Sequence, residues 1–546
     1  MADSSKKVVR QAAFLMAAHL ISSVIGLLYR SPLHSIMGSA GAGYYSYAYD
    51  WYTIILLIAS YSIPSAVSKV MAERLAVGEY RNAQKVFKAA LLYVLIVGGI
   101  GASAAFFGAP LLLKEQPDAV LALRILSPTI LLSGFLGVFR GFFQAHNNMK
   151  PTAISQVAEQ ILNAVFSVLM AWIFIRPYIG DENLTGKYGA AGGTVGTGAG
   201  VAAGLLFMIF VYWINRGYIQ SRIRKDRHRK EESYRQVFRD ILLMVTPIIF
   251  ATFIYNLTTI IDQKLFTNLM LWKETAADEV NRLYGIFGYN YKPIINIPIA
   301  LASATSTALI PAIATSMAER KMKEAASKIE ECIKLTMFIS IPSAVGLGVL
   351  SYPVMRLLYP RADIKAAAIL LTLGAVSVVL FSYSTVTNGV LQGSGHAVIP
   401  VRNAAISIAV NVIVLFICDG LLNTGVYGIL LATIMYSLTY CVLNLLSVKH
   451  RLRYHCDLRE TYLTPILCAA VMGAIVAAIY WLPAKLLPSV FGRYILSGLL
   501  TFLAILVGVI AYIVMYTKFT GMTDEELRQI PLGTRMLRLL RLLHLR

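Results

Sequence analysis

Eight ionisable side chains lie within or at the edges of long apolar stretches: Arg30, Asp50, Arg124, Arg140, Glu159, Asp262, Lys264 and Lys292. An uncompensated charge in such a stretch is costly, so these side chains usually face a water-filled cavity or pair with one another. Their types and spacing favour recognition of a charged group during its passage across a membrane.

Glu159 lies about two turns into the apolar stretch that begins near Pro151. A carboxylate at that depth requires a proton or a cationic partner. Arg140, near the end of the preceding stretch, is the nearest basic candidate on the same side. We therefore expect a structural ion pair between Arg140 and Glu159, or a pair that also contacts a substrate.

Four further charges each have two interpretations. Arg30, Asp50 and Lys264 either extend to the membrane surface or face a cavity. The surface interpretation of Asp50 treats its neighbours as an interfacial aromatic belt, made of Tyr44, Tyr45, Tyr47, Tyr49, Trp51 and Tyr52. Lys292 lies within about two turns of the outer end of its stretch, so it is another surface cation or a cavity cation.

Asp262, Asn411 and Thr433 could supply oxygen ligands to a sodium ion, although each is also an ordinary polar residue of a helix. The five cysteines have no metal-ligand spacing and read as packing residues. Walker, GxSxG and HExxH motifs are absent. The sequence therefore predicts no enzyme and no cofactor, and any transport would depend on sodium or proton gradients, the membrane potential or the substrate gradient.

The elements that must position these residues are membrane-spanning helices. Hydrophobic residues make up 57% of the chain and charged residues only 14%. Apolar stretches of roughly 20 residues recur along the sequence, each long enough to cross the hydrocarbon core as a helix. Since lipid offers no partner to backbone groups, such stretches must be helical. The fold class is an all-α integral membrane protein.

About fourteen spans are predicted: 11–30, 43–68, 87–110, 119–143, 152–175, 189–214, 240–263, 286–316, 331–352, 366–391, 400–418, 424–447, 461–482 and 494–517. An even number puts both termini on the same side. With the N-terminus inside, most of the 49 lysines and arginines fall in inner segments. This excess predicts cytoplasmic termini, and it explains the net charge of +21 without nucleic acid.

Two basic segments fit this orientation. The loop 216–239 is a cytoplasmic linker rather than a nucleic-acid patch, because it lies between two spans. In the tail 523–546, arginines recur every three residues among leucines, which predicts an amphipathic helix on the inner leaflet; docking of a partner is the alternative.

The two halves of the chain resemble each other in order. Met71-Ala-Glu-Arg74 after Pro64 corresponds to Met317-Ala-Glu-Arg320 after Pro311, and Gly141 to Gln144 corresponds to Gly389 to Gln392, at nearly constant offset. The repeat predicts an N-terminal lobe, 1–215, and a C-terminal lobe, 240–448, each of six spans, with substrate between them. The spans within 461–517 have no counterpart in the repeat.

Several motifs resemble a known family. They are Gly26-Leu-Leu-Tyr29-Arg30, Gly43-Tyr-Tyr, the stretch from Ile63 to Arg74, and Arg140-Gly-Phe-Phe-Gln144 continuing through Pro151-Thr-Ala-Ile-Ser-Gln156-Val-Ala-Glu159-Gln160. The chain resembles the stage V sporulation protein B type of polysaccharide transporter. This type is a branch of the lipid II flippase (MurJ-like) family in the multidrug/oligosaccharidyl-lipid/polysaccharide exporter superfamily.

The resemblance implies a flippase that moves undecaprenyl-pyrophosphate-linked peptidoglycan precursor to the outer leaflet by alternating access, for cell wall biogenesis and cell shape. It implies a lipid-tail groove formed by 461–517, a bacterial plasma membrane location and a monomer that contacts membrane lipids. Substrate-binding candidates are Arg30, Asp50, Arg140, Gln144, Glu159, Lys292, Asn388 and Gln392.

Lys292 stands where relatives have an arginine, and Tyr29-Arg30 departs from the Arg-Asp of the Gram-negative branch. The alternatives are a flippase for another lipid-linked polysaccharide precursor and a cation-coupled drug antiporter, which would have twelve spans and acidic cavity residues. An integral-membrane glycosyltransferase would need catalytic carboxylates on a large outer loop. The connection 264–285 offers only Glu274, Asp278 and Glu279, in what reads as a solvated helix. A regulatory membrane protein is the remaining alternative.

Overall fold

The computed structural model describes residues 2–61, 63–226, 232–319, 321–396, 398–452, 458–486 and 494–520, together with Leu537 and Arg541. Within these residues the secondary structure is helical and contains no strand, which confirms the predicted fold class. Contacts between residues divide the chain into two compact units, Met1–Gly285 and Ile286–Arg546. The predicted tail helix at 523–546 lies outside the described residues except for Leu537 and Arg541.

The described residues of the first unit form nine α-helices. They are α1 (Ala2–Leu28), α2 (Arg30–Leu56), α3 (Ile63–Ala76), α4 (Tyr80–Leu112), α5 (Val120–Ala145), α6 (Lys150–Ile175), α7 (Glu182–Arg224), α8 (Tyr234–Trp272) and α9 (Ala277–Gly285). A π-helical turn, Leu57–Tyr61, precedes α3. Gly38, with φ of 69°, kinks α2. A positive φ suits glycine because it has no Cβ.

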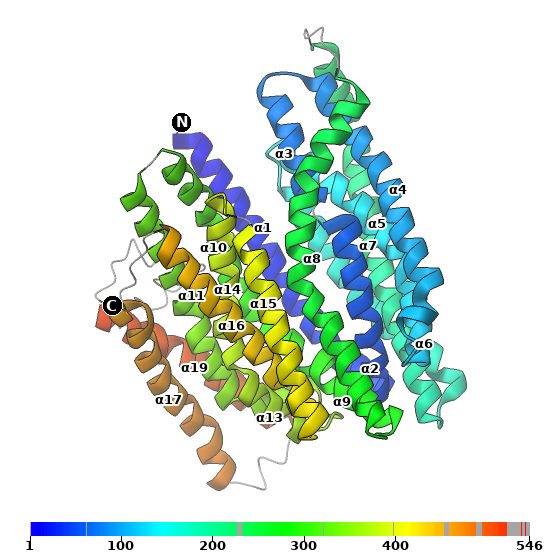
Figure 1. Ribbon diagram of the computed structural model, residues 1–546, viewed down its shortest axis with the longest axis vertical. Helices are drawn as coiled ribbons and strands as arrows, with labels where there is room; N and C mark the ends of the chain where they lie inside the picture. The colour runs from blue at the N-terminus through cyan, green and yellow to red at the C-terminus, as the bar shows by residue number, and fades with distance from the viewer. Residues whose placement is uncertain are drawn as a thin grey trace. The chain divides into compact units, whose positions relative to one another are not determined.

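Helix α7 is the packing centre of the first unit, since it contacts α2, α5 and α6 (Figure 1). Small residues permit this close approach. A Cβ on Gly200 would lie 2.4 Å from the Glu159 carbonyl oxygen, and one on Gly196 would lie 2.1 Å from Ser167 Oγ. Stripes of small residues allow helix backbones to approach within a membrane. The glycine-rich sequence of α7 therefore has a packing role against α6.

Helix α8 packs onto the first unit through both charge and apolar surface. The Arg74 side chain, only 10% exposed, forms ion pairs with Glu232 at 3.1 Å and Asp240 at 2.5 Å. Val237 and Ile241 of α8 belong to the same buried core as α3, α4 and α5. These contacts fix the start of α8. The lobes predicted from the repeat follow sequence similarity rather than contacts, and they stay a prediction.

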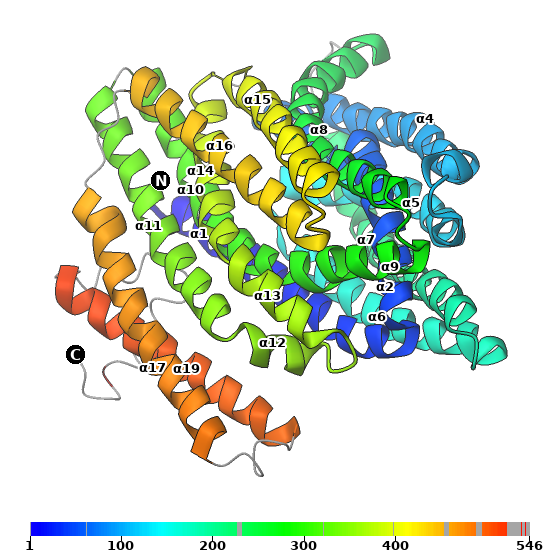
Figure 2. The same cartoon turned by 60° about the horizontal axis from the view of Figure 1, so that its bottom comes forward.

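The second unit contains nine described α-helices. They are α10 (Lys292–Ala318), α11 (Met322–Val349), α12 (Ser351–Leu358), α13 (Ile364–Gly374), α14 (Val376–Gly393), α15 (Val398–Leu415), α16 (Val426–Leu452), α17 (Thr464–Leu486) and α19 (Tyr494–Thr520). Helices α10, α11, α14 and α16 form its main contacts, and α17 and α19 lie side by side with α17 along α11 (Figure 2). A π-helix, Ile286–Tyr291, leads into α10.

Each of the fourteen predicted spans overlaps helical structure. Ten helices in the described part of the chain are long and apolar enough to cross a membrane, or eleven when the bent pair α13 and α14 counts as one span. The bend of 46° occurs where Tyr291 packs against Gly374, whose carbonyl oxygen accepts a hydrogen bond from the Tyr291 hydroxyl at 3.1 Å. The chain is therefore a multi-pass membrane protein, and the count of fourteen stays a prediction.

Candidate functional site

The ion pair between α5 and α6 is present. Arg140 Nη2 donates to Glu159 Oε2 at 2.7 Å, and its Nε donates to Ser155 Oγ at 3.0 Å. The two charged side chains are 15% and 19% exposed. Pairing offsets the cost of placing either charge in an apolar bundle. The structure thus confirms the expected pair, and it adds Ser155 as a further partner of Arg140.

The neighbouring glycines explain how the two helices hold this pair. Gly141 follows Arg140, and a Cβ there would lie 2.7 Å from the Pro64 carbonyl oxygen of α3. Gly200 of α7 packs against the backbone at Glu159. Both helices that carry the pair are therefore held by close backbone contacts. In the Arg140-Gly141 sequence, Arg140 supplies the charge, and the close contact of Gly141 with α3 holds the helix that positions this charge.

Three tyrosines of α2 form a continuous face beside this pair. Tyr45, Tyr49 and Tyr52 have helical spacing, and successive ring centroids lie 5.4 Å apart. The Arg30 guanidinium lies 5.9 Å from the Tyr45 ring. Tyr49 is within electrostatic range of both Arg30 and Glu159. We call Tyr45, Tyr49 and Tyr52 the tyrosine face; it connects the Arg30 end of α2 with the α5–α6 ion pair.

The interpretation of these aromatic residues as an interfacial belt is wrong. Tyr44, Tyr45, Tyr47 and Tyr52 are each at most 3% exposed, whereas belt residues would contact lipid headgroups. Their burial follows from the packing of α2 against α5, α7 and α9 within the first unit. The closely spaced tyrosines of α2 therefore indicate a buried region of the first unit that contains many hydroxyl groups.

Asp50 has a buried partner from α9. The Tyr284 hydroxyl donates to Asp50 Oδ2 at 2.5 Å, and the Tyr284 ring stacks on Tyr47 with centroids 4.3 Å apart. The Tyr47 hydroxyl shares a hydrogen bond of 2.7 Å with Thr267 of α8. The expectation of a solvated helix in 264–285 holds for one face only: Glu274 and Asp278 are exposed, whereas Val280 and Tyr284, one turn apart on α9, are fully buried.

Lys264 of α8 forms a salt bridge with Glu115, in the connection after α4. Burial alone would raise the pKa of Glu115, but the hydrogen bond and charge of Lys264, with a backbone hydrogen bond and the charge of Lys114, together lower that pKa. The ammonium also lies 6.0 Å from the Trp51 ring. Lys264 is therefore a structural cation that ties α8 to the α4–α5 connection.

The second unit holds the remaining binding candidates. Lys292, the first residue of α10, lies 4.8 Å from the Phe287 ring centroid and is half-buried. On α14, Gln392 Nε2 donates to Asn388 Oδ1 at 2.8 Å. Gln144 of the first unit makes no side-chain hydrogen bond with the described residues. The structure thus brings together Arg140 with Glu159 and Asn388 with Gln392.

The three sodium candidates are divided between the units. Asp262 is buried in α8, whereas Asn411 and Thr433 belong to α15 and α16. Thr433 donates to the Ile429 carbonyl oxygen, and neither amide atom of fully buried Asn411 has a partner within the described residues. Those residues contain no group of three histidines, cysteines or acids suited to a metal. A sodium site at Asp262, Asn411 and Thr433 stays a prediction.

Comparison with known proteins gives the family. A sequence profile described as polysaccharide biosynthesis protein matches residues 8–317, and the MatE profile matches residues 291–417. This chain belongs to the polysaccharide biosynthesis protein family. That membership confirms the resemblance described above, including the wider exporter superfamily.

Two relatives from Bacillus subtilis and one solved structure are similar to this chain over most of its length. The lipid II flippase MurJ of Bacillus subtilis (strain 168) is 26% identical over 495 residues, covering 87% of this chain and 89% of the relative. Stage V sporulation protein B of the same organism is 23% identical, with 96% and 97% coverage. A solved structure of lipid II flippase MurJ, inward closed conformation, has a TM-score of 0.62 at 16% identity, covering 92% and 98%.

The last similarity shows a shared fold. Because the matched proteins of this polysaccharide biosynthesis protein family and its superfamily are transporters rather than enzymes, the expectation that this chain is not an enzyme is confirmed.

Sequence analysis missed Tyr284, Glu115 and the role of Arg74. A signal existed for Tyr284: Val280 and Tyr284 are one turn apart, which gives α9 an apolar face. Glu115 carried no such signal, since its partner Lys264 is 149 residues away in sequence.

Proposed function

We propose that this protein is a flippase that moves undecaprenyl-pyrophosphate-linked peptidoglycan precursor, lipid II, from the inner to the outer leaflet by alternating access. The observation that carries the proposal is Arg30 at one end of the tyrosine face, inside an apolar helix bundle. A pyrophosphate diester carries about two negative charges, and its bare passage through lipid would be prohibitive. The Arg30 guanidinium offers that headgroup a charged partner, and the partly exposed Tyr49 offers a phenol hydroxyl.

Two other features support a lipid-linked cargo. Lys292 is a second cation at the start of an apolar helix, although in the other unit. Helices α17 and α19 lack a counterpart in the repeat, and their many exposed apolar side chains, among them Leu467, Val471, Leu499 and Phe502, suit contact with a polyprenyl tail. The tail could then stay in lipid while the headgroup crosses between protein walls. The charged pyrophosphate would not have to enter the hydrocarbon core of the membrane. Coupling to sodium, protons or the membrane potential belongs to the same proposal.

A second candidate is a flippase for another lipid-linked polysaccharide precursor. It is favoured by the similarity to stage V sporulation protein B over almost the entire chain. Both candidates require the same cationic recognition of a lipid-linked pyrophosphate, and they differ in the sugar attached to it.

The test is depletion of the protein in its host, in a strain without a redundant flippase, followed by measurement of lipid II in each leaflet. We expect lipid II to accumulate on the inner leaflet. Normal lipid II on the outer leaflet would contradict the first candidate. Accumulation of a different lipid-linked precursor would support the second.

Variants locate the site in the same assay. Arg30→Ala and Lys292→Ala should each fail to restore outer-leaflet lipid II. Arg176→Ala and Lys365→Ala are the matched controls. Arg176 lies 3.6 Å from the Trp172 ring at the end of α6, and Lys365 is exposed on α13. Full complementation by both Arg30→Ala and Lys292→Ala, at normal protein level, would remove the cavity assignment.

A further inference from the structure

A cavity lies in the first unit, and none of the tyrosine face lines it. It has a volume of about 320 Å³ and is enclosed by the ends of α3, α4, α5 and α7. Ligand pockets in proteins begin at about 300 Å³. Its α5 residues Phe142 and Ala145, and the following His146, are on the opposite side of that helix from Arg140 and Gln144. We call it the α3–α7 pocket.

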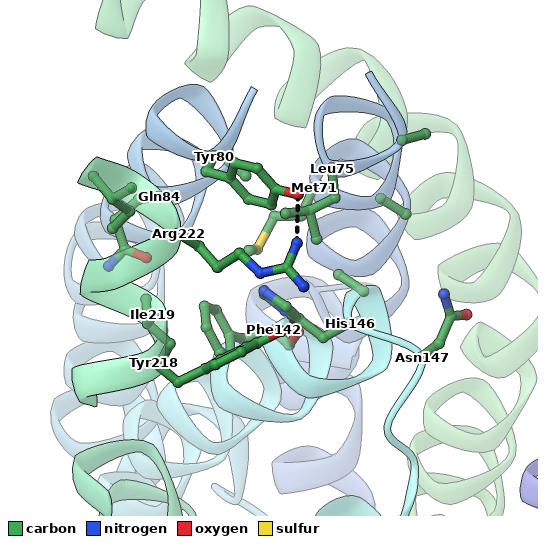
Figure 3. Close-up of a pocket in the computed structure, with 15 residues that line it drawn as sticks. Met71, Leu75, Tyr80, Gln84, Phe142, His146, Asn147, Tyr218, Ile219 and Arg222 are labelled. Atoms are coloured by element: carbon green, nitrogen blue, oxygen red, sulfur yellow. Dashed lines mark hydrogen bonds between the residues drawn. The ribbon is translucent and has the colours of Figure 1, made fainter. Parts of the chain in front are cut away.

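Arg222 supplies the charge of this pocket. Its side chain reaches from α7 into the pocket, with the Tyr80 ring on one side and Phe142 and His146 on the other (Figure 3). Nη1 donates to the Tyr80 hydroxyl at 2.8 Å, and the guanidinium carbon lies 5.4 Å from the Tyr80 ring and 5.3 Å from that of Tyr218. Phenol and aromatic contacts hold the guanidinium in place without neutralising it.

No carboxylate pairs with Arg222 among the residues that the structure describes, in contrast to Arg74 and Arg140. A guanidinium has five N–H donors, and the Tyr80 hydroxyl uses one of them. The charge is therefore held in position, and within the described part of the chain no carboxylate compensates it. A phosphate group is the partner that matches a planar guanidinium with free donors.

His146 is a second polar group of the pocket. Its Nδ1 lies 2.9 Å from the Phe142 carbonyl oxygen, which can only accept, so Nδ1 carries the proton and donates. Partial burial lowers the pKa of His146; the hydrogen bond to that carbonyl opposes this shift, and the positive charge of Arg222 adds a smaller lowering. Arg222 is thus the main positive charge that an incoming ligand meets.

The rest of the lining is apolar. Met71 and Leu75 come from α3, and Ile219 and Ile223 lie on the same face of α7 as Arg222. A small soluble anion gains nothing from such surface, whereas the glycerol and upper acyl region of a lipid would bury apolar area there. Tyr80 and Tyr218 of the lining are of a residue type that is enriched at the headgroup level of membranes.

We propose that the α3–α7 pocket binds the phosphate diester of an anionic membrane lipid, with Arg222 on the phosphate and the apolar wall of α3 and α7 on the glycerol region. With the orientation predicted from the charge distribution, this lipid belongs to the inner leaflet. The site is separate from the transport site proposed above, and it adds a bound lipid that holds the ends of α3 and α7 together.

The test uses the purified full-length protein in detergent and measures binding of short-chain phosphatidylglycerol and phosphatidylcholine with the same acyl chains. We expect phosphatidylglycerol to bind at least 10-fold more tightly. Arg222→Gln should weaken that binding about 10-fold, because a charge-assisted hydrogen bond is lost. Leu75→Trp, which fills the pocket without changing its charge, should weaken binding of phosphatidylglycerol to a similar extent.

Arg216→Gln is the matched control, since Arg216 is on the same helix, exposed, and 5.9 Å from the Trp213 ring outside the pocket. It should leave phosphatidylglycerol affinity unchanged, and thermal unfolding would verify that each variant is folded. Equal binding of the two lipids, or equal losses in Arg222→Gln and Arg216→Gln, would overturn the proposal. Glycerol phosphate binding as tightly as phosphatidylglycerol would assign the pocket to soluble phosphates and overturn the lipid assignment.

Discussion

Basic side chains of the first unit either stabilise the fold or are available to bind a ligand, and sequence position alone does not distinguish the two roles. Arg74, Arg140 and Lys264 are each paired with carboxylates, so their charges are largely compensated by the fold. Arg222 is held by aromatic rings instead, which leaves its charge available to a ligand. The partner, rather than the residue type, distinguishes a structural cation from a binding cation.

At this scale we predict the effect of removing one partner of the α5–α6 ion pair. Glu159→Gln should lower the free energy of unfolding by about 3 kcal/mol, because it leaves the Arg140 charge uncompensated in an apolar bundle. Thermal unfolding of the detergent-purified protein measures this. The double variant Arg140→Met/Glu159→Leu should recover most of the loss. A single variant as stable as the natural protein would show that the pair is already well solvated.

Helix packing in the first unit depends on small residues at particular positions. Helix α7 contains Gly196 and Gly200, where any Cβ would collide with α6, and also Gly217, where nothing lies within 4 Å of a Cβ. Gly196 and Gly200 are therefore required for the close contact between α6 and α7, whereas Gly217 is not.

At the scale of the element we predict opposite responses to the same substitution in α7. Gly200→Ala should destabilise the protein by about 2 kcal/mol, because the methyl group forces α6 and α7 apart. Gly217→Ala should leave stability unchanged or raise it slightly, since alanine favours the helix. Thermal unfolding of the two variants, side by side, is the measurement. Equal effects would indicate that backbone contact at Gly200 does not determine the spacing of the helices.

For the whole molecule, the contacts separate two units after Gly285, so that α8 and α9 complete the first unit. The ion pairs of Arg74 with Glu232 and Asp240 show why the segment after the basic loop belongs there.

At this scale we predict the orientation in the membrane, with both termini in the cytoplasm. In a protein whose native cysteines are replaced by alanine, Glu182→Cys should react with a membrane-impermeant maleimide in intact protoplasts. Val77→Cys should react only after permeabilisation. Both positions are exposed: Glu182 is the first residue of α7, and Val77 lies in the α3–α4 connection. The reverse labelling pattern would contradict the orientation derived from the positive charges.

The sequence by itself determined that this protein is a helical membrane protein, where its apolar helices lie, and that Arg140 pairs with Glu159. These features are local. The hydropathy of a single segment is enough to predict that it forms a membrane helix, and the two members of that pair are 19 residues apart on consecutive helices. Family membership also followed from short motifs, because they preserve residue types at fixed spacing.

Only the tertiary structure decided that Tyr284 is the partner of Asp50, 234 residues away, and that the tyrosines of α2 face the protein interior rather than lipid. It also decided that Arg222, within the segment predicted as a basic loop, lies on helix α7 and lines a pocket. The physical reason is that lipid and protein interior are both apolar, so hydropathy cannot show which face of a membrane helix contacts another helix. That choice depends on side-chain packing between segments that are distant in the sequence.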